Sequence, residues 1–337
     1  MKKLLCTLGI FILLCFVNAT ALGSSAKVNL VWQPIVNEEN DLSSIKKLAG
    51  VNVVSPSWFI IDTNDGHITD NSDFLYGQYA QKKGYKIWAL ITNDFDPEKT
   101  HKWLHNKKSR KYIINQMLFY AKRYPIDGYN FDFENIYDTD RDALSSFVEE
   151  ATMALHKEGL VVSMDITVQS SMKNWSSCYD RQRLGKVLDY VILMAYDEHG
   201  RLSKTAGSVA SINWVENGVK NLLQSVPADK IILGLPLYMR LWQEDNEGKV
   251  SATTLDMAGA EKLLKEKSAK RVWLKEQGQY YFTYVENGKQ YKIWQEDKKS
   301  LSLKADLVKK YNLAGVASWR KGFEKQNIWG MLSRKLK

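Results

Sequence analysis

Short apolar runs alternate with amphipathic stretches along the chain from residue 27 onward. Eight runs rich in β-branched and aromatic residues predict strands, at residues 28–33, 51–61, 86–92, 124–135, 160–168, 190–196, 230–237 and 314–319. Apolar residues at helical spacing predict helices at residues 42–48, 74–83, 109–123, 140–159, 212–223 and 303–311. Strands separated by helices pair in parallel through right-handed crossovers. Eight such units predict a (β/α)8 TIM barrel of the α/β class. A doubly wound open sheet is the alternative, although no glycine-rich turn follows the first strand to bind a nucleotide.

One segment, between residues 237 and 314, interrupts this alternation. Residues 255–265 have helical spacing, and residues 271–274, 280–285 and 289–294 have the character of strands. Glu286-Asn287-Gly288 joins the last two as a hairpin signal. We predict a small α+β insertion at about residues 243–300, between strand 7 and strand 8. The loop after strand 7 opens on the face of a barrel where active sites lie, so the insertion is expected to wall a cleft.

The fourth predicted strand has an unusual pattern. Within Tyr124-Pro-Ile-Asp-Gly-Tyr-Asn-Phe-Asp-Phe-Glu-Asn135, the polar residues Asn130, Asp132 and Glu134 alternate with aromatic ones. Side chains alternate between faces along a strand, so one face carries an amide and two carboxyl groups. Burying neighbouring carboxyl groups is costly, and it raises the pKa of one of them, which suits Glu134 as a general acid. The pattern therefore predicts an active site at the end of this strand.

The N-terminal residues predict a secretory signal peptide over residues 1–21. Lys2 and Lys3 precede an almost unbroken apolar run at residues 4–17, and Ala19-Thr20-Ala21 fits a cleavage site. The apolar run is shorter than the roughly 20 residues of a membrane span, and an uncleaved anchor is the alternative. We expect a secreted protein, extracellular or associated with the cell wall, in which residues 22–337 form one catalytic barrel.

Composition adds information about partners. Cys6 and Cys15 lie in the predicted signal, so Cys178 is left without an internal disulfide partner. Removing Lys2 and Lys3 changes the formal charge from +9 to +7. Such a charge suits anionic wall polymers, although a solvated basic surface explains it equally well. The 11 Trp and 17 Tyr favour sugar binding, because sugar rings stack on aromatic faces. We predict a polysaccharide substrate, no nucleic acid, no stable membrane insertion after signal cleavage, and a monomer.

Several motifs together resemble glycoside hydrolase family 18. Residues 127–134 are similar to the family signature Asp-Gly-x-Asp-x-Asp-x-Glu, with Asn130 in place of the middle Asp. Met194-Ala-Tyr-Asp197 resembles its Met-x-Tyr-Asp motif, and Ala317-Ser-Trp319 resembles its closing strand. The resemblance is closest to the YaaH/SleL-like subgroup of spore-cortex and cell-wall N-acetylglucosaminidases. The motifs that carry this are Tyr196-Asp-Glu-His199, Gly234-Leu-Pro-Leu-Tyr238 with Arg240, Tyr281-Phe-Thr-Tyr284 and Trp294-x-Glu-Asp297.

The resemblance implies a retaining, substrate-assisted mechanism. Glu134 would protonate the glycosidic oxygen and then activate water, while the 2-acetamido oxygen of the substrate attacks the anomeric carbon. Asp132 would orient the acetamide N–H, and Tyr196 would hydrogen-bond the acetamide oxygen. Trp319 would stack under the sugar ring. The further expected substrate contacts are Asn130, Asp197, Tyr238, Arg240 and His199. We predict no cofactor and no metal.

Some interpretations remain alternatives. Asn130 can be a core hydrogen-bonding residue or a support for the site, and Glu198 and His199 can be exposed loop residues or substrate contacts. Peptidoglycan is favoured over chitin as the substrate because of the subgroup resemblance. The alternative function is that of a non-catalytic, chitinase-like lectin, but such proteins usually lose the acid that Glu134 supplies here.

Two patterns with metal-ligand spacing are interpreted without a metal. His101 and His105 have the i, i+4 spacing of zinc ligands, but no acidic residue follows His101, so an exposed helix face is predicted. The acids within residues 138–149 imitate a calcium loop. Ala143 occupies the position that requires glycine, so a charged helix start is predicted there.

Overall fold

The computed structural model describes residues 26–34, 47–325 and 327–337. The predicted signal peptide and most of the helix predicted at residues 42–48 lie outside the described residues, so both stay predictions. Across the described ranges, no helix has both the length and the apolar character that crossing a membrane requires.

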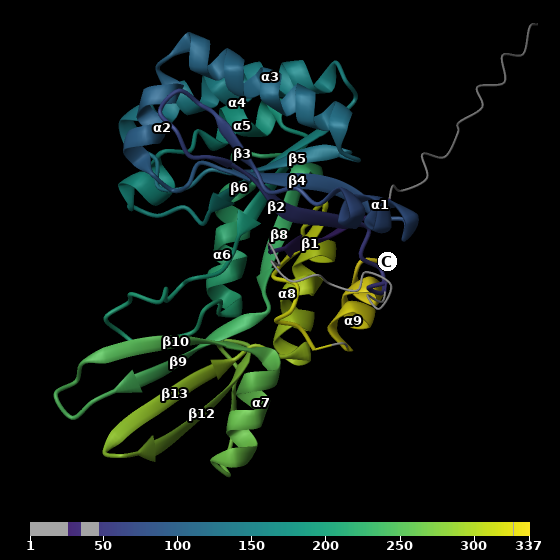
Figure 1. Ribbon diagram of the computed structural model, residues 1–337. Coiled ribbons are helices and arrows are strands. Elements are labelled where there is room, and N and C mark those ends of the chain that lie inside the picture. Colours follow the sequence, from purple (N-terminus) through teal and green to yellow (C-terminus); the bar gives the residue numbers. More distant parts are fainter. Residues whose placement is uncertain (1–25, 35–46, 326) are drawn as a thin grey trace, which may run out of the picture.

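Eight parallel strands close into a barrel (Figure 1). They follow one another in the order β1-β14-β8-β7-β6-β5-β4-β2, and the pairing of β1 with β2 closes the ring. The strands are β1 (Val28–Gln33), β2 (Val53–Ile61), β4 (Lys86–Thr92), β5 (Gly128–Asp132), β6 (Val161–Thr167), β7 (Tyr190–Met194), β8 (Ile231–Pro236) and β14 (Gly315–Trp319). Every predicted strand is present, so the TIM barrel is confirmed and the open sheet is excluded.

Helices cover the outside of the barrel (Figure 1). They are α1 (Phe74–Lys82), α2 (Pro97–Leu104), α3 (Lys107–Arg123), α4 (Arg141–His156), α5 (Arg181–Val187), α6 (Ile212–Leu222), α8 (Lys298–Lys310) and α9 (Asn327–Lys335). Shorter elements are β3 (Ile68–Asp70), η2 (Asp138–Asp140), η3 (Lys173–Ser177) and η4 (Ala228–Lys230). The apolar pattern does not predict α2, whose start is set by Asp96, which accepts hydrogen bonds from the N–H groups of Glu98 and Lys99.

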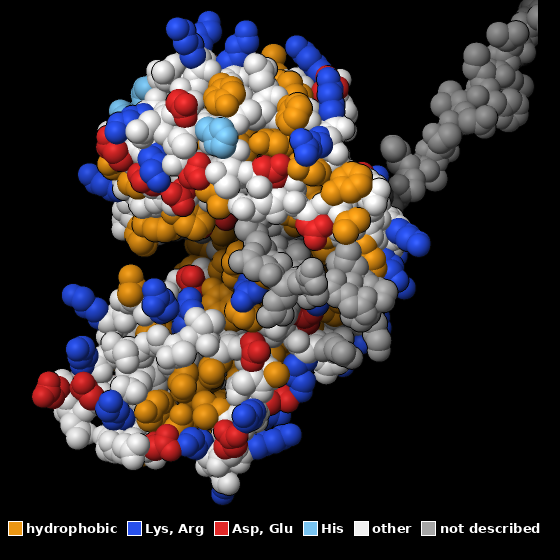
Figure 2. Space-filling model, in the orientation of Figure 1, with side chains coloured by type: hydrophobic (Ala, Val, Ile, Leu, Met, Phe, Trp, Pro, Cys, Tyr) orange, Lys and Arg blue, Asp and Glu red, His pale blue; other side chains and the backbone are white. Residues whose placement is uncertain are grey.

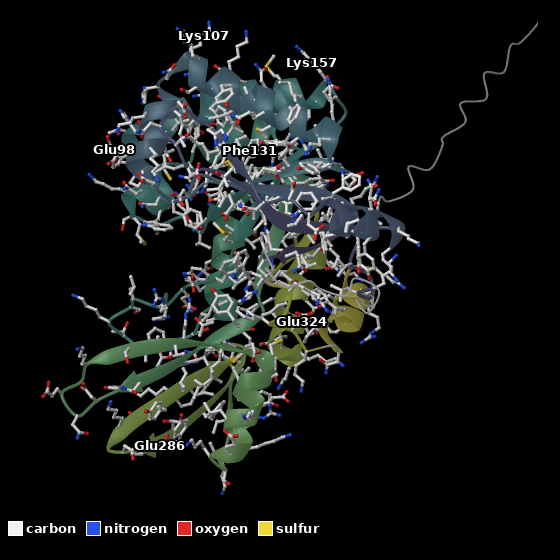
Figure 3. All side chains as sticks on the ribbon, in the orientation of Figure 1. Glu98, Lys107, Phe131, Lys157, Glu286 and Glu324 are labelled. Atoms are coloured by element: carbon white, nitrogen blue, oxygen red, sulfur yellow. The ribbon has the colours of Figure 1, made fainter. Side chains whose placement is uncertain are left out.

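The alternation predicted along β5 is confirmed. The aromatic residues point outward and are buried under the helices. The hydroxyl of Tyr129 donates to the carbonyl of Met117 on α3 at 2.7 Å, and Phe133 packs edge-on against Trp103 of α2. Phe131, labelled in Figure 3, stacks on Phe133 with ring centroids 5.2 Å apart. The polar residues of the same strand therefore face the barrel interior.

The insertion is a five-stranded antiparallel sheet with one helix, at the bottom of Figure 1. Its elements are β9 (Tyr238–Glu244), β10 (Val250–Asp256), α7 (Met257–Glu266), β11 (Val272–Leu274), β12 (Gln279–Glu286) and β13 (Lys289–Gln295). The strand order is β10-β9-β13-β12-β11. The sheet begins at Tyr238, directly after β8, rather than near residue 243. The sequence pattern does not predict β10, because this strand has no fully buried residue.

A buried ion pair joins the insertion to the barrel. Lys304 of α8 and Glu296, which follows β13, are 1% and 0% exposed, with the Nζ atom 2.6 Å from Oε1. The side chains of Gln279 and Ser300 also donate to the Glu296 carboxylate, at 2.6 and 2.7 Å. Four polar groups thus satisfy one another where the sheet returns to the barrel.

Candidate active site

A cleft of about 450 Å³ lies at the carboxyl ends of the barrel strands. Figure 2 shows the surface hollowed between the barrel and the insertion. Six of the predicted site residues line the cleft: Asp132, Glu134, Tyr196, Asp197, Tyr238 and Trp319. They come from β5, β7, β9 and β14 or from the residues that follow these strands. The barrel therefore gathers side chains that are far apart in the sequence.

Two carboxyl groups lie at the end of β5. Asp132 is the last residue of the strand, and its burial raises its pKa from 3.8 to about 7. Burial, followed by the negative charges of Asp132 and Asp197, raises the pKa of Glu134 well above its ordinary value. Glu134 therefore tends to keep its proton near neutral pH. The Oδ1 atom of Asp132 has no hydrogen-bond partner among the described residues, so it is available to accept one.

The backbone of Glu134 is held by a residue of the neighbouring loop. Asn93, fully buried after β4, donates from Nδ2 to the Glu134 carbonyl at 2.9 Å and accepts the Glu134 N–H at 3.0 Å. Asn135 donates to the carbonyl of Phe95 at 2.9 Å. The loops after β4 and β5 are thus fastened to each other, and this fixes where the Glu134 side chain begins.

Left-handed backbone is concentrated around the cleft. Among the described residues, seven that are not glycine have positive φ angles. Four of them belong to the loops after β4, β5 and β7: Asp94, Phe95, Asn135 and Asp197, with φ angles of 59°, 51°, 50° and 61°. Such conformations cost free energy and cluster at functional sites. The strain supports the assignment of this end of the barrel as the site.

Asn130 lies inside the barrel and does not line the cleft. Its Oδ1 accepts from the Trp32 indole at 2.8 Å and from the Ser55 hydroxyl at 3.2 Å. Its Nδ2 donates to Asp165 of β6 at 2.8 Å. The position of Asn130 therefore fits support of the site from below, rather than the direct substrate contact that we predicted.

Asp165 is a residue of the site that our sequence reasoning missed. It is buried, lines the cleft, and has a pKa raised first by burial and then by the charge of Asp132. The carboxyl group that β5 lacks because of Asn130 is thus present on the neighbouring strand. A lone acid in the apolar run at residues 160–168 was the signal that could have revealed it.

A second polar cluster joins the insertion to the end of β7. The hydroxyl of Tyr238 and the Nη2 group of Arg240 both donate to the Oδ1 atom of Asp197, at 2.8 and 2.7 Å. The Arg240 guanidinium also lies 4.9 Å from the centre of the Tyr238 ring. Arg240 does not line the cleft itself, so it acts on Asp197 and Tyr238.

Tyr196 stands beside these residues with its hydroxyl protonated. Burial, followed by the charge of Asp165, raises the pKa of Tyr196 well above 10, so the hydroxyl stays a hydrogen-bond donor. A Cβ atom at Gly234 would lie 2.6 Å from the Leu193 carbonyl oxygen and 3.2 Å from the Tyr196 ring. Glycine at that position of β8 therefore allows the close approach of β7 and the tyrosine.

Trp319 and His199 occupy different places. Trp319 lines the cleft at the end of β14 and meets Trp32 edge to face, with centroids 5.7 Å apart. The Nδ1 atom of His199 is 2.9 Å from the Ser208 carbonyl, and its ring packs against Gly207. Its position does not support the predicted substrate contact, because the ring fastens its own loop instead.

The remaining lining includes residues without a pattern in the sequence. Glu198 lines the cleft, but its carboxylate accepts from the N–H and hydroxyl of Ser211 at 2.8 and 3.0 Å, so it also orders the start of α6. Phe95, Trp175 and Trp214 add aromatic surface from other segments. No motif marks these three aromatic residues, two of which lie in η3 and α6, so they were not predicted, whereas Glu198 was considered as a substrate contact or an exposed loop residue.

Comparisons with known proteins agree with this geometry. The family model described as glycosyl hydrolases family 18 matches residues 32–323. The chain is 31% identical over 289 residues to the uncharacterized glycosylase YvbX of Bacillus subtilis (strain 168), covering 83% of each. It is 27% identical to the cortical fragment-lytic enzyme of the same organism, covering 75% of this chain and 61% of that enzyme, so it spans less than two thirds of that relative. A chitinase structure from Chromobacterium violaceum ATCC 12472 shares the fold, with a TM-score of 0.83, 23% identity and coverage of 92% and 99%.

Proposed function

The chain belongs to glycosyl hydrolases family 18 and is a glycoside hydrolase, and on that premise we propose that it is a secreted, retaining enzyme that cleaves β-linked N-acetylglucosamine glycans. The observation that carries the mechanism is the burial of Glu134 beside Asp132 at the end of β5, which keeps a proton on Glu134 near neutral pH. Peptidoglycan is the proposed substrate, with chitin second. The similarity to a cortical fragment-lytic enzyme and the formal charge of +7 that remains without Lys2 and Lys3 support that order.

The proposed reaction proceeds in two steps. Glu134 gives its proton to the glycosidic oxygen while the acetamido oxygen of the substrate attacks the anomeric carbon and the leaving sugar departs. The resulting oxazolinium is opened by water on the same carbon, and Glu134, now a carboxylate, removes the proton from that water. The two displacements give net retention, and the substrate supplies the nucleophile that a second enzyme carboxylate supplies in other glycosidases.

Asp132 and Tyr196 position the acetamido group in this proposal. The unpartnered Oδ1 of Asp132 accepts the acetamide N–H, and the Tyr196 hydroxyl donates to the acetamide oxygen. The positive charge of the oxazolinium favours ionised Asp132, while Asp165 retains its proton because it is buried beside the negative charge of Asp132. Holding reacting groups in line in this way lowers the entropic part of the barrier.

Sugar binding is assigned to the surface around these groups. Trp319 offers its ring for stacking at the end of β14. Asp197 and Tyr238 present polar atoms to the same cleft, and Arg240 orients them through its ion pair with Asp197. A polar cluster beside an aromatic surface suits a ring that has one apolar face and hydroxyl groups around its edge.

The substitution Glu134→Gln tests the proposal. Release of reducing ends from peptidoglycan and chitin oligomers should fall by at least about 10²-fold, because positioned acid–base catalysis contributes about that much. Glycan binding should persist, since the amide has the same shape. Glu98→Gln is the control, because Glu98 lies on the outer side of α2 (Figure 3) and its side chain is 60% exposed.

Product analysis distinguishes the remaining outcomes. Mass spectrometry of digested peptidoglycan should show N-acetylglucosamine at the new reducing ends, and muramic acid there would refute the glucosaminidase assignment. Undiminished hydrolysis by Glu134→Gln would refute the role of Glu134. If the wild-type protein binds glycan but releases no reducing ends, the lectin alternative is correct.

A further inference from the structure

Two histidines and a buried aspartate meet on the outer side of the barrel, away from the cleft. The Nδ1 atom of His101 lies 2.9 and 3.0 Å from the two carboxylate oxygens of Asp140, and the Nε2 atom of His105 lies 2.9 Å from Oδ1. The two imidazole centroids are 4.5 Å apart. The acidic partner that the sequence around His101 lacks is thus supplied by a residue 39 positions away.

Asp140 is not explained by the ordinary duties of a carboxylate at a helix start. It precedes α4 and could cap that helix, but its side chain makes no capping hydrogen bond. Its side chain is 1% exposed, whereas those of His101 and His105 are 44% and 51% exposed. A buried carboxylate therefore points at two half-exposed imidazoles, with solvent on their far side.

The donor atoms are arranged closely enough to share one ion. One nitrogen from each ring and one carboxylate oxygen all lie within 4.8 Å of one another. Two ligands on a tetrahedral zinc ion, each at about 2.0–2.1 Å, lie about 3.3 Å apart. The 2.9 Å separations between nitrogen and oxygen are a few tenths of an ångström shorter, so small side-chain movements would accommodate an ion.

We propose that His101, His105 and Asp140 form a binding site for a divalent first-row transition ion, with Zn²⁺ as the physiological choice. Two imidazoles and one carboxylate suit zinc, whereas calcium and magnesium prefer oxygen ligands alone. The exposed side of the imidazoles leaves room for water to complete the coordination.

A metal ion at this site would link two segments of the chain. His101 lies in α2, His105 directly follows it, and Asp140 ends η2, which follows the loop that carries Glu134. Figure 1 places α2 beside α4 at one side of the barrel. The same two segments are joined nearer the cleft by Asn93 and the Glu134 backbone. A bound ion would therefore stabilise the wall of the cleft from its outer side, without contacting substrate.

The test measures zinc binding and thermal stability in the untagged chain. Chelator-treated protein is equilibrated with zinc chloride, and bound zinc is determined by elemental analysis after dialysis. The variants are His101→Gln and His105→Gln. The matched control is His156→Gln, because His156 also contacts a carboxylate, with Nε2 2.9 Å from Asp189 Oδ2, but has no second histidine there.

The expected results separate a metal site from a set of hydrogen bonds. Wild type and the His156→Gln control should each bind one zinc ion and gain thermal stability from it. His101→Gln and His105→Gln should bind at least about tenfold more weakly and gain none at the same zinc concentration. The two variants are independent, so one that failed to fold would leave the other to decide. Absence of zinc binding by the wild type, or equal binding by all four proteins, would overturn the proposal.

Discussion

The buried carboxyl group of Asp132 should make the stability of the protein fall as pH rises. Its pKa is raised from 3.8 to about 7 by burial, so the folded state binds a proton over a pH range in which the unfolded state does not. Stability from this group is fully present below pH 3.8 and is lost as pH rises through about 7. Asp132→Asn removes the effect, because an amide does not ionise.

The magnitude follows from the change in pKa. A change of one in pKa corresponds to about 1.36 kcal/mol, so the difference between 3.8 and about 7 corresponds to about 4 kcal/mol. With about 2.1 cal/mol/K of unfolding entropy per residue over roughly 300 residues, this amounts to about 6 °C in Tm. Removing the Asp132 charge also lowers the pKa of Glu134 and Asp165. This too makes the variant more stable relative to the wild type as pH rises.

Scanning calorimetry at pH 4 and pH 8 provides the measurement. At each pH, the Tm of the wild type is subtracted from that of Asp132→Asn. This difference should be about 6 °C more positive at pH 8 than at pH 4. Taking this difference between pH values cancels any fixed cost of the amide group. Asp142→Asn controls for the loss of one negative charge, because the Asp142 side chain is 88% exposed. A difference that stays constant within about 1 °C would show that Asp132 is not desolvated as described.

Three further predictions concern other parts of the molecule. Asp197→Asn removes a negative charge that raises the pKa of Glu134, so the alkaline limit of the pH–activity profile should move to lower pH; an unchanged or higher limit would contradict this. Lys304→Met leaves Glu296 charged and buried, so the free energy of unfolding should fall by about 3–5 kcal/mol in denaturant titrations, and adding Glu296→Gln should recover part of it. A loss below about 1 kcal/mol would show the pair to be unimportant. Trp319→Ala should raise KM about tenfold for glycan oligomers through lost stacking, and an unchanged KM would remove Trp319 from the sugar site.

Much of the barrel could be predicted because each strand is a local pattern. The apolar runs at residues 28–33 and 86–92 coincide with β1 and β4, and glycine and proline mark several boundaries. Strand β10 escaped detection because none of its residues is fully buried, so no strongly apolar face marks it. Helix α2 escaped because few of its residues are apolar. Patterns of burial predict elements only where burial itself is periodic.

The site residues also fall into two groups, those in contiguous motifs and those that stand alone in the sequence. Asp132, Glu134 and Tyr196 lie in contiguous motifs that resemble a known family, so the sequence predicted them as site residues, and the structure places all three in the cleft. Asp165 and Asn93 are single polar residues whose importance depends on which strand or loop the fold brings next to them. His199 lies in a motif, but its ring contacts its own loop and does not line the cleft. Membership of a motif therefore does not determine which way a side chain points.

The passage from β8 into β9 has a consequence for how the enzyme could be altered. Tyr238 and Arg240 lie in β9 and bind Asp197, so the wall of the cleft and the first strand of the insertion are the same piece of chain. At the other end, Glu296 is locked to Lys304. The insertion therefore cannot be replaced as an independent unit by cutting the chain at its predicted boundaries near residues 243 and 300. A graft between relatives would have to join at Leu237 and after Lys304, and would carry part of the substrate specificity with it.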